Sequence, residues 1–421
     1  MSYVIIGNSF AAIGAVEGIR KHDIRTPIII ISDEPYHTYS RPLISYYLGG
    51  KVPEEKIYYR DKDFYEKNKV EPILGIRAER VDFDKKEVLL RDGRRIPYNK
   101  LLIATGGKPI TPLLEGIEKK NVFSFIKLDD VKEIEKAAVK GSRAVVVGAS
   151  FSGLKAVEAL VQRGVKVTVI DIMDRIMPRV FDERASQIAK KTLEKYGVEV
   201  LLKTTVEKIL GAEKAEGVSL KDGREIACDF VILAVGVRCN TDLVKDTNMK
   251  INRGIVVDDR MRTSIPDVYA AGDVAEGYNF IEDKYMEIAI IPNAYKQGET
   301  AGENMAGAEK SFNKGFIMNS MPLFDLSVIS AGLSSETGDD IRVKTVFKEK
   351  EDVYKKFYVR ENKLVGYLLI NDIDRAGIYT GLIMSGEDIS LIEENIGEDG
   401  FGFISFPKEA RKVKMLKGWS V

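Results

Sequence analysis

Two segments of the sequence repeat the same succession of features, and this repeat constrains the fold more than any other pattern. Each starts with a run of apolar residues, turns at small residues, continues as an amphipathic helix and ends in a second apolar run that meets an acid (residues 3–34 and 143–171). A continuous apolar run is typical of a strand buried on both faces of a parallel sheet. The sequence therefore predicts two β-strand–helix–β-strand units with buried parallel sheets.

The turn of each unit has the spacing of a dinucleotide-binding loop in a degenerate form. The full pattern has three glycines, whereas the two copies read Gly7-x-Ser9-x-x-Ala12 and Gly148-x-Ser150-x-x-Gly153. Backbone N–H groups of such a turn can approach a pyrophosphate at the helix N-terminus, and an acid about 20 positions further on can bind a ribose diol. Two ordinary crossovers with small residues for packing remain the alternative. Because both copies end in an acid, we predict two dinucleotide sites.

The regions between and after these units indicate three domains. Each unit is followed by an Asp-Gly hairpin turn and a strand that ends in Ala-x-Gly, and a third such strand precedes a helix that we expect to begin near Pro292. The last hundred or so residues show alternating strand patterns and then a helix around residues 378–384. We predict an α/β chain with two Rossmann-like, three-layer dinucleotide-binding domains and a C-terminal α+β domain.

Composition excludes several classes of function. Lys+Arg and Asp+Glu balance at 64 each, which argues against a bulk affinity for nucleic acid or for a membrane surface. No apolar run reaches the roughly 20 residues of a membrane span, and the first residues lack a basic leader, so we expect a cytoplasmic protein. The two cysteines, Cys228 and Cys239, have the spacing of neither a CxxC pair nor a metal site, and we expect no bound metal.

Two further segments carry a resemblance to a known family. These are residues 263–273 (TSIPDVYAAGD) and the Ala104-Thr105-Gly106 turn. With the two glycine turns, the chain resembles the pyridine-nucleotide-dependent flavoproteins of glutathione-reductase fold, in particular rubredoxin and ferredoxin reductases and the flavoprotein portion of nitrite reductase. The resemblance implies an FAD domain at residues 1–112 and 241–314, an NAD(H) domain at 113–240 and an interface domain at 315–421.

The resemblance also implies which residues contact FAD. Asp273 should bond a ribitol hydroxyl, although it could merely cap the next turn, and Arg41 should lie beside the flavin and its pyrophosphate, although it could be a solvated arginine. The helix that begins near Pro292 should stabilise negative charge on the flavin, unless it is an ordinary helix start. The full set is Gly7, Ser9, Phe10, Ala11, Ala12, Asp33 or Glu34, Arg41, Pro42, Ala78, Ala104, Thr105, Gly106, Gly272, Asp273, Pro292, Asn293 and Ala294.

The second glycine turn is similar to the family's pyridine-nucleotide site. Its acid, Asp171, favours NAD(H), because a carboxylate bonds the 2′-hydroxyl of NAD and repels the 2′-phosphate of NADP. The glycine of the following Ala-x-Gly and the residue after it should lie beside the nicotinamide. The residues expected to bind NAD(H) are Gly148, Ser150, Phe151, Ser152, Gly153, Asp171, Gly236 and Val237.

The sequence departs from the family's pattern at two places near the flavin. The disulfide-reducing members carry a CxxxxC pair, and related peroxide-reducing members one cysteine, in a stretch that contains no cysteine here (residues 40–51). Without a thiolate there can be no mixed disulfide or sulfenic acid. A Lys and a Glu that lie near the flavin in ferredoxin-reductase relatives are replaced by Tyr46 and Lys155. We predict Lys155 and Tyr46 as the catalytic residues at the flavin edge and hypothesise that Lys155 supplies the cation there; the alternative is that Lys155 faces solvent.

A flavin that accepts hydride and releases electrons singly needs a one-electron partner when no redox thiol is present. We therefore predict an NAD(H) oxidoreductase that serves an iron–sulfur carrier, namely a ferredoxin, a rubredoxin or a polyferredoxin-like subunit, which could form a stable complex with another redox enzyme. The alternatives are an NADH oxidase or diaphorase that acts on a small acceptor, and a flavoprotein subunit with a sensing or structural role. The expected docking segments are Tyr36–Tyr47 and the C-terminal domain with its tail at 412–421, although the tail could equally pack within the chain.

Overall fold

The computed structural model describes residues 2–335 and 340–417, which form two compact units. The first unit comprises Met1–Pro112, Ile126–Lys132 and Gly236–Phe316. The second comprises Leu113–Phe125, Glu133–Val235 and Ile317–Val421. The second unit thus contains both the second dinucleotide-binding unit and the C-terminal domain.

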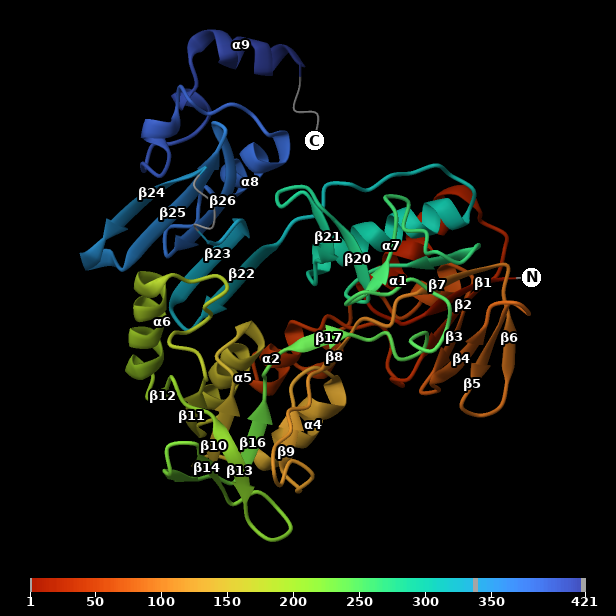
Figure 1. Cartoon of the computed structure of the whole chain (residues 1–421), viewed down its shortest axis with the longest axis horizontal. Coiled ribbons are helices and arrows are strands. Elements are labelled where there is room, and N and C mark those ends of the chain that lie inside the picture. Colours follow the sequence, from red (N-terminus) through yellow and green to blue (C-terminus); the bar gives the residue numbers. More distant parts are fainter. Residues whose placement is uncertain (1, 336–339, 418–421) are drawn as a thin grey trace. The chain divides into compact units, whose positions relative to one another are not determined.

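The first unit contains a parallel sheet with the strand order β19-β7-β1-β2-β3. Figure 1 labels four of these strands, β1, β2, β3 and β7. The central strand, β1, is fully buried and pairs in parallel with β2 and β7, as its apolar run predicts. The sheet strands are β1 (Tyr3–Ile6), β2 (Ile28–Ser32), β3 (Val70–Leu74), β7 (Lys100–Ile103) and β19 (Val268–Ala270). Smaller sheets are formed by β4 (Ala78–Asp82), β5 (Glu87–Leu90) and β6 (Arg95–Pro97), by β8 (Gly107–Pro109) and β17 (Val237–Cys239), and by β18 (Ile255–Val256), β20 (Ala275–Asn279) and β21 (Lys284–Glu287).

The helices of the first unit include α1 (Phe10–His22), which follows the first glycine turn, and α7 (Ile291–Met305), the helix predicted to begin near Pro292. The others are α2 (Leu43–Leu48), η1 (Glu54–Lys56) and α3 (Phe64–Lys67), while α4 (Leu128–Ala137) starts in the first unit and ends in the second.

Helices α1 and α7 interlock through glycines. A Cβ atom on Gly298 would lie 2.0 Å from the carbonyl oxygen of Ala11, and one on Gly14 would lie 2.3 Å from that of Tyr295. One turn further along both helices, a Cβ atom on Gly302 would lie 2.2 Å from the carbonyl oxygen of Ala15, and one on Gly18 would lie 2.3 Å from that of Glu299. Because contacting residues advance together along both helices, the helices run in the same direction and their N-termini lie at the same end. Two helix dipoles therefore act on one region of the first unit.

We expect Gly298→Ala to destabilise the protein by about 1–3 kcal/mol, since its methyl group would force two backbones apart. Thermal unfolding followed by circular dichroism measures the change. The matched control is Gly377→Ala in a C-terminal helix, where a Cβ would meet nothing within 4 Å. There alanine should stabilise the helix by up to about 1 kcal/mol. Equal effects of the two substitutions would contradict the interlocked packing.

The second unit repeats the parallel architecture, with the strand order β12-β11-β10-β16-β9. β10 pairs in parallel with β11 and β16, so the second predicted unit is confirmed. Its elements are β9 (Val122–Ser124), β10 (Arg143–Val147), α5 (Phe151–Gln162), β11 (Lys166–Ile170), α6 (Glu183–Lys195), β12 (Glu199–Leu201), β13 (Val206–Leu210), β14 (Gly217–Leu220), β15 (Glu225–Ala227) and β16 (Phe230–Leu233).

The C-terminal part of the second unit is an antiparallel sheet with the order β22-β23-β26-β25-β24, against which α8 packs. Its elements are β22 (Met318–Leu323), β23 (Leu326–Gly332), β24 (Ile341–Lys348), η2 (Glu349–Glu351), β25 (Val353–Arg360), β26 (Lys363–Ile370), α8 (Ala376–Ser385), η3 (Glu393–Asn395), η4 (Phe403–Ser405) and α9 (Lys408–Lys417). The predicted α+β composition of this region is confirmed.

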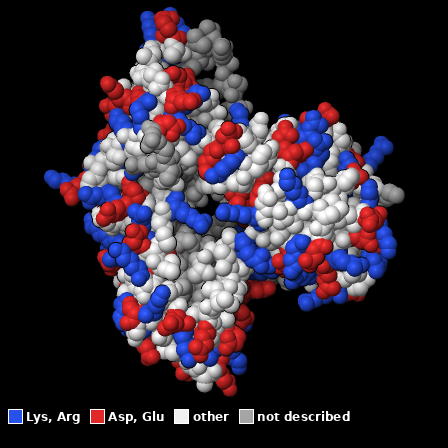
Figure 2. Space-filling view, in the orientation of Figure 1, with Lys and Arg blue, Asp and Glu red and all other residues white. Residues whose placement is uncertain are grey.

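The surface carries no dominant charge of one sign on the face that Figure 2 shows, where basic and acidic side chains are interspersed. This agrees with the formal net charge of zero. Within residues 2–335 and 340–417, no helix is long and apolar enough to cross a membrane. The same residues contain no group of three or more His, Cys, Asp or Glu side chains that could hold a metal ion.

Candidate functional site

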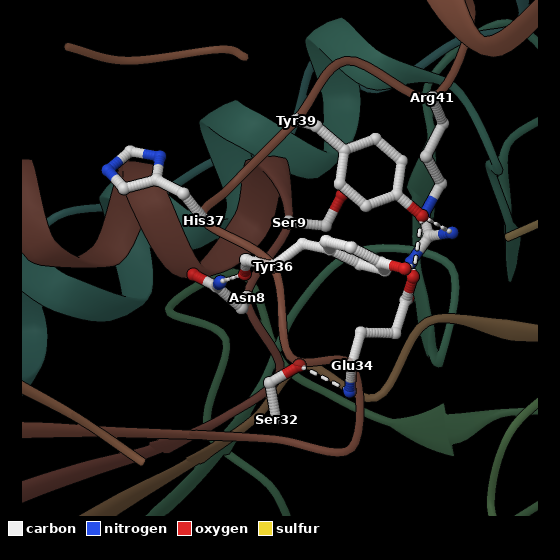
Figure 3. Close-up of a pocket in the computed structure, with 8 residues that line it drawn as sticks. All are labelled: Asn8, Ser9, Ser32, Glu34, Tyr36, His37, Tyr39 and Arg41. Atoms are coloured by element: carbon white, nitrogen blue, oxygen red, sulfur yellow. Dashed lines mark hydrogen bonds and ion pairs between the residues drawn. The ribbon is translucent and has the colours of Figure 1, made fainter. Parts of the chain in front are cut away.

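A pocket lies at the carboxyl ends of β1 and β2 in the first unit (Figure 3). It lies beside the first glycine turn, as expected for a ligand site of a parallel sheet. In Figure 3 the side chains of Glu34, Tyr39 and Arg41 converge, whereas the His37 ring points away from them. The lining residues are Asn8, Ser9, Ser32, Glu34, Tyr36, His37, Tyr39 and Arg41.

The first glycine turn packs against the Ala104–Gly106 turn at the start of α1. Gly7 has a φ of +123°, and a Cβ there would lie 2.1 Å from the carbonyl oxygen of Ala104, so only glycine fits. The Ala104–Gly106 turn is thereby held against the first turn. Ser9 is the N-cap residue of α1, yet its side chain makes no capping hydrogen bond and instead lines the pocket. Uncapped N–H groups with a free hydroxyl beside them suit a pyrophosphate.

The remaining residues expected on this helix serve packing. Phe10 is 6% exposed and packs edge-on against Tyr59, with the ring centroids 4.4 Å apart. Ala11 meets Gly298 of α7, and Ala12 is fully buried. Their backbone, rather than their side chains, is what the turn can offer to a ligand.

The structure distinguishes between the two acids at the end of β2. Glu34 is 7% exposed, and its carboxylate accepts hydrogen bonds from the Arg41 guanidinium and the Tyr39 hydroxyl, each at 2.6 Å. Asp33 is exposed and pairs with Lys127 at 2.8 Å. Glu34 is therefore the acid that lines the pocket, and it is the better candidate for the ribose ligand.

Arg41 is anchored on several sides. Besides Glu34, its guanidinium donates to the Ile126 carbonyl at 2.9 Å and to the Tyr39 hydroxyl at 3.0 Å. The Tyr39 hydroxyl also accepts from the Leu128 N–H, at the start of α4. The alternative of a merely solvated arginine does not hold. Sequence reasoning missed Tyr39, whose only signal is its position two residues before the arginine.

Two other predicted FAD residues are Pro42, which follows the pocket residue Arg41, and Ala78, which follows a loop that is bonded to the pocket residues Ser32 and Glu34. Pro42 is exposed and is the N-cap residue of α2. Ala78 is the first residue of β4, after a loop whose Gly75 and Ile76 N–H groups donate to the backbone carbonyls of Glu34 and Ser32. These bonds hold the loop over the end of β2.

Asp273 is partly buried directly after the Gly272 turn. Burial raises the pKa of its carboxyl, while the positive charge of Arg41 lowers it. Among the described residues no donor forms a hydrogen bond to this carboxylate, so it does not cap the following turn. A desolvated carboxylate that accepts no hydrogen bond from the described residues suits a ligand hydroxyl, as expected for the ribitol of FAD.

The predicted helix start is also where the structure places it. α7 begins at Ile291 with Pro292 in its first turn, and its N-cap residue, Ile290, offers no side-chain cap. Asn293 is 3% exposed, and its Oδ1 atom has no hydrogen-bond partner. Ala294 packs against Gly272, so this uncapped helix end adjoins the turn that carries Asp273. Such an end can stabilise negative charge.

The second unit presents the other glycine turn. A Cβ on Gly148 would lie 2.4 Å from the Ala234 carbonyl oxygen, and one on Gly153 would lie 2.0 Å from that of Gly148. Ser150 is the N-cap residue of α5 and accepts from the Gly153 N–H. Asp171 bends back onto this turn, accepting from the Ala149 N–H at 2.6 Å and the Met173 N–H at 2.8 Å. The remaining predicted residues of the turn, Phe151 and Ser152, open α5.

Other predicted contacts are placed as follows. The Thr105 hydroxyl donates to the Asn240 carbonyl at 2.8 Å. Gly236 has a φ of +113°, and Val237 is 48% exposed. Lys51 places its ammonium 5.2 Å from the ring centroid of Tyr46.

Lys155 does not face solvent. Its side chain is 17% exposed, pairs with Glu158 on the same helix and donates to the Pro322 carbonyl at 3.1 Å. Glu158 also accepts from the Phe324 N–H, in the turn between β22 and β23. The lysine therefore links α5 to the C-terminal sheet. Its role at the flavin stays a prediction.

The predicted docking segments are partly accounted for within the chain. Tyr36 bonds to Asp129 on α4, and Tyr39 is buried. Of the C-terminal tail, residues up to Lys417 belong to α9, while residues 418–421, which include Trp419, lie outside the described residues.

Neither cysteine has the environment of a redox thiol. Both are buried, and burial raises the pKa of Cys228 to about 12 and that of Cys239 to about 11. Reactive cysteines instead have a lowered pKa. We expect a Cys228→Ala/Cys239→Ala double variant to oxidise NADH with ferricyanide at more than half the rate of the unaltered protein. A loss of tenfold or more with FAD still bound would contradict this.

Comparisons with known proteins agree with this geometry. Residues 1–298 match the family model of the pyridine nucleotide-disulphide oxidoreductases, and residues 318–387 match the rubredoxin NAD+ reductase C-terminal domain. The NAD(P)H nitrite reductase of Bacillus subtilis is 32% identical over 92% of this chain, which spans only 48% of that relative. Subunit epsilon of the NADH-dependent phenylglyoxylate dehydrogenase of Aromatoleum evansii is 30% identical over 99% of this chain and 98% of its own length.

Two further similarities concern electron-transfer enzymes. The NADH-rubredoxin oxidoreductase of Clostridium acetobutylicum is 29% identical over 82% of this chain and 85% of its own length. The covalent putidaredoxin reductase–putidaredoxin complex has the same fold, with a TM-score of 0.87 at 22% identity over 99% of this chain and 98% of that one. The chain therefore belongs to the pyridine nucleotide-disulphide oxidoreductase family, as an FAD- and NAD(H)-dependent oxidoreductase.

Proposed function

We propose that this protein passes electrons between NAD(H) and a one-electron iron–sulfur carrier without a thiol intermediate. The observation that carries the proposal is the state of the cysteines: both are buried with raised pKa values, and none occurs at residues 40–51. A family member without a reactive thiol has to deliver its electrons outside the chain. Two comparisons support an iron–sulfur acceptor. The Clostridium relative is named as a rubredoxin oxidoreductase, and residues 318–387 match the C-terminal domain of rubredoxin NAD+ reductases.

The residues of the first unit fit FAD, which when bound would accept hydride and release electrons singly. We assign the pyrophosphate to Ser9 and the first turn of α1, the adenosine ribose to Glu34 and the ribitol to Asp273. The uncapped start of α7 would stabilise negative charge on the reduced ring. In the second unit, the glycine turn at Gly148 would hold the pyrophosphate of NAD(H).

Anaerobic stopped-flow spectroscopy tests the proposal. NADH should reduce the bound flavin within seconds, and reduced enzyme should then be reoxidised faster by ferredoxin or rubredoxin than by oxygen or a quinone. Fast reoxidation by oxygen or quinone alone would indicate an oxidase or diaphorase. Slow flavin reduction by NADH would indicate a sensing or structural subunit.

A second possibility within this function concerns the assembly. We propose that the carrier is an iron–sulfur subunit of a stable complex with another redox enzyme in the cytoplasm. The relative from Aromatoleum that matches over its whole length is itself named as a subunit. Native mass spectrometry of the protein purified from its own cells tests this: a single species at the 47.0 kDa of the chain, or a multiple of it, would argue against the complex.

A further inference from the structure

The turn that carries Asp273 is bonded to a buried side chain as well as to the backbone: the Ala271 N–H donates to the Ile103 carbonyl, and the Ala275 N–H donates to the Gly272 carbonyl. No described residue donates a hydrogen bond to the Asp273 carboxylate, and Arg41 acts on it through its charge alone. The preceding residue, Gly272, has a φ of +80°, and its N–H donates to the Oε1 atom of Gln297 at 2.9 Å. The direction of the carboxylate is therefore set by the backbone, and the backbone is bonded to Gln297.

Gln297 is fixed between two elements of the first unit. It lies on the second turn of α7 and is only 1% exposed. On the side of β20, its Nε2 atom lies 2.4 Å from the place that a Cβ on Gly277 would occupy. Glycine at this position leaves the space that the amide needs. The side chain is thus confined by α7, by β20 and by its bond to the Gly272 turn.

We propose that Gln297 is a positioning residue for flavin binding: by holding the Gly272 N–H, it orients the Asp273 carboxylate toward the ribitol hydroxyl. This inference rests on the proposed contact between Asp273 and FAD. Loss of the glutamine oxygen would leave a buried N–H without a partner, and the turn would relieve that cost by rotating. Asp273 would then turn with it. Gln297 itself touches no ligand in this scheme.

The test measures how fast FAD leaves the holoenzyme after dilution, by the rise in flavin fluorescence. Gln297→Met keeps the size of the side chain and removes the hydrogen-bond acceptor, and it should accelerate release about tenfold. The visible circular dichroism of the bound flavin should change as well, because its ribitol contact is altered. Gln187→Met, at an exposed position on α6, is the control and should change neither signal.

A double-mutant cycle with Asp273→Asn separates positioning from general packing. If Gln297 acts through Asp273, the double variant should release FAD no faster than Asp273→Asn alone. Additive effects, or no effect of Gln297→Met, would overturn the inference. If Asp273→Asn releases FAD at the rate of the unaltered enzyme, the proposed ribitol contact itself is wrong, which distinguishes the two failures.

Gly277→Ala provides an independent route if Gln297→Met does not fold. Its methyl group pushes the Gln297 amide from the side of β20 without removing the glutamine. It should also accelerate FAD release severalfold, and this effect should vanish in the Asp273→Asn background. An unchanged rate for Gly277→Ala would count against the role of Gln297.

Discussion

Replacing Lys155 with methionine should destabilise the second unit by about 2 kcal/mol, because it removes the cation from a carboxylate that is almost out of water and leaves it with hydrogen bonds such as that from the Phe324 N–H. The Glu158 side chain is only 3% exposed and has Lys155 as its ion-pair partner. The ammonium also donates to the Pro322 carbonyl in the C-terminal sheet. Urea denaturation followed by circular dichroism measures the loss. An unchanged midpoint would show that the pair contributes nothing.

A compensating variant identifies the cause of that loss. In Lys155→Met/Glu158→Met, two apolar side chains of similar length replace the pair, and part of the stability should return, although the Phe324 N–H then loses its acceptor. If the double variant were as unstable as the single one, lost packing rather than the loss of the cation beside Glu158 would be the reason. Lys190→Met is the matched control: it breaks an exposed pair with Glu194 and should change stability by less than about 0.5 kcal/mol.

The same pair of variants tests the predicted flavin role of Lys155 without interference from stability. The double variant should be folded but lack the cation. If Lys155 stabilises negative charge at the flavin, its removal should lower the flavin midpoint potential and slow hydride transfer from NADH. A folded double variant with unaltered potential and rate would restrict Lys155 to its link with Pro322.

Much of the fold follows from local sequence. The buried strand β1 and its counterpart β10 are continuous apolar runs. Such runs are typical of a parallel sheet, where helices cover both faces and the strands are buried on both sides. Gly7 and Gly148 were predictable for the same kind of reason: each follows a buried strand directly, and each adopts a positive φ against the backbone of a neighbouring turn. These features depend on residues that are close in sequence.

The details of the site depend on residues far apart in sequence. Asp33 and Glu34 are neighbours, and their different roles arise from Lys127 and Arg41. Lys155 meets Pro322, which is 167 residues away. No pattern of small or charged residues encodes such partners.

Two glycine patterns of the sequence bear on how the helices pack. Gly14-x-x-x-Gly18 and Gly298-x-x-x-Gly302 are spaced to place small residues on one helix face, which allows close helix contact. Gln297 precedes Gly298 of the second pair and is a buried polar residue of α7. Its side chain accepts a hydrogen bond from the Gly272 N–H, in the turn that carries Asp273. The paired spacing could have predicted that α1 and α7 pack together.

The coenzyme preference should reverse when the charge at Asp171 is removed. Its carboxylate lies on the second glycine turn, where it accepts from the N–H groups of Ala149 and Met173. A negative charge there repels the 2′-phosphate of NADPH. In Asp171→Ala/Ile172→Arg the two N–H groups are released and a guanidinium is added. Because Ile172 is 69% exposed, the arginine should cost little stability.

We expect the ratio of kcat/KM for NADPH to that for NADH to rise by about 100-fold or more in this double variant, as charge repulsion is replaced by a charge-assisted hydrogen bond. Ferricyanide as acceptor keeps the measurement independent of the protein partner. Asp171→Asn isolates the charge, since it keeps the size of the side chain and one acceptor oxygen, and it should give a smaller rise. If neither variant alters the ratio, Asp171 does not contact the 2′ position, and the second glycine turn must bind the nucleotide in another orientation.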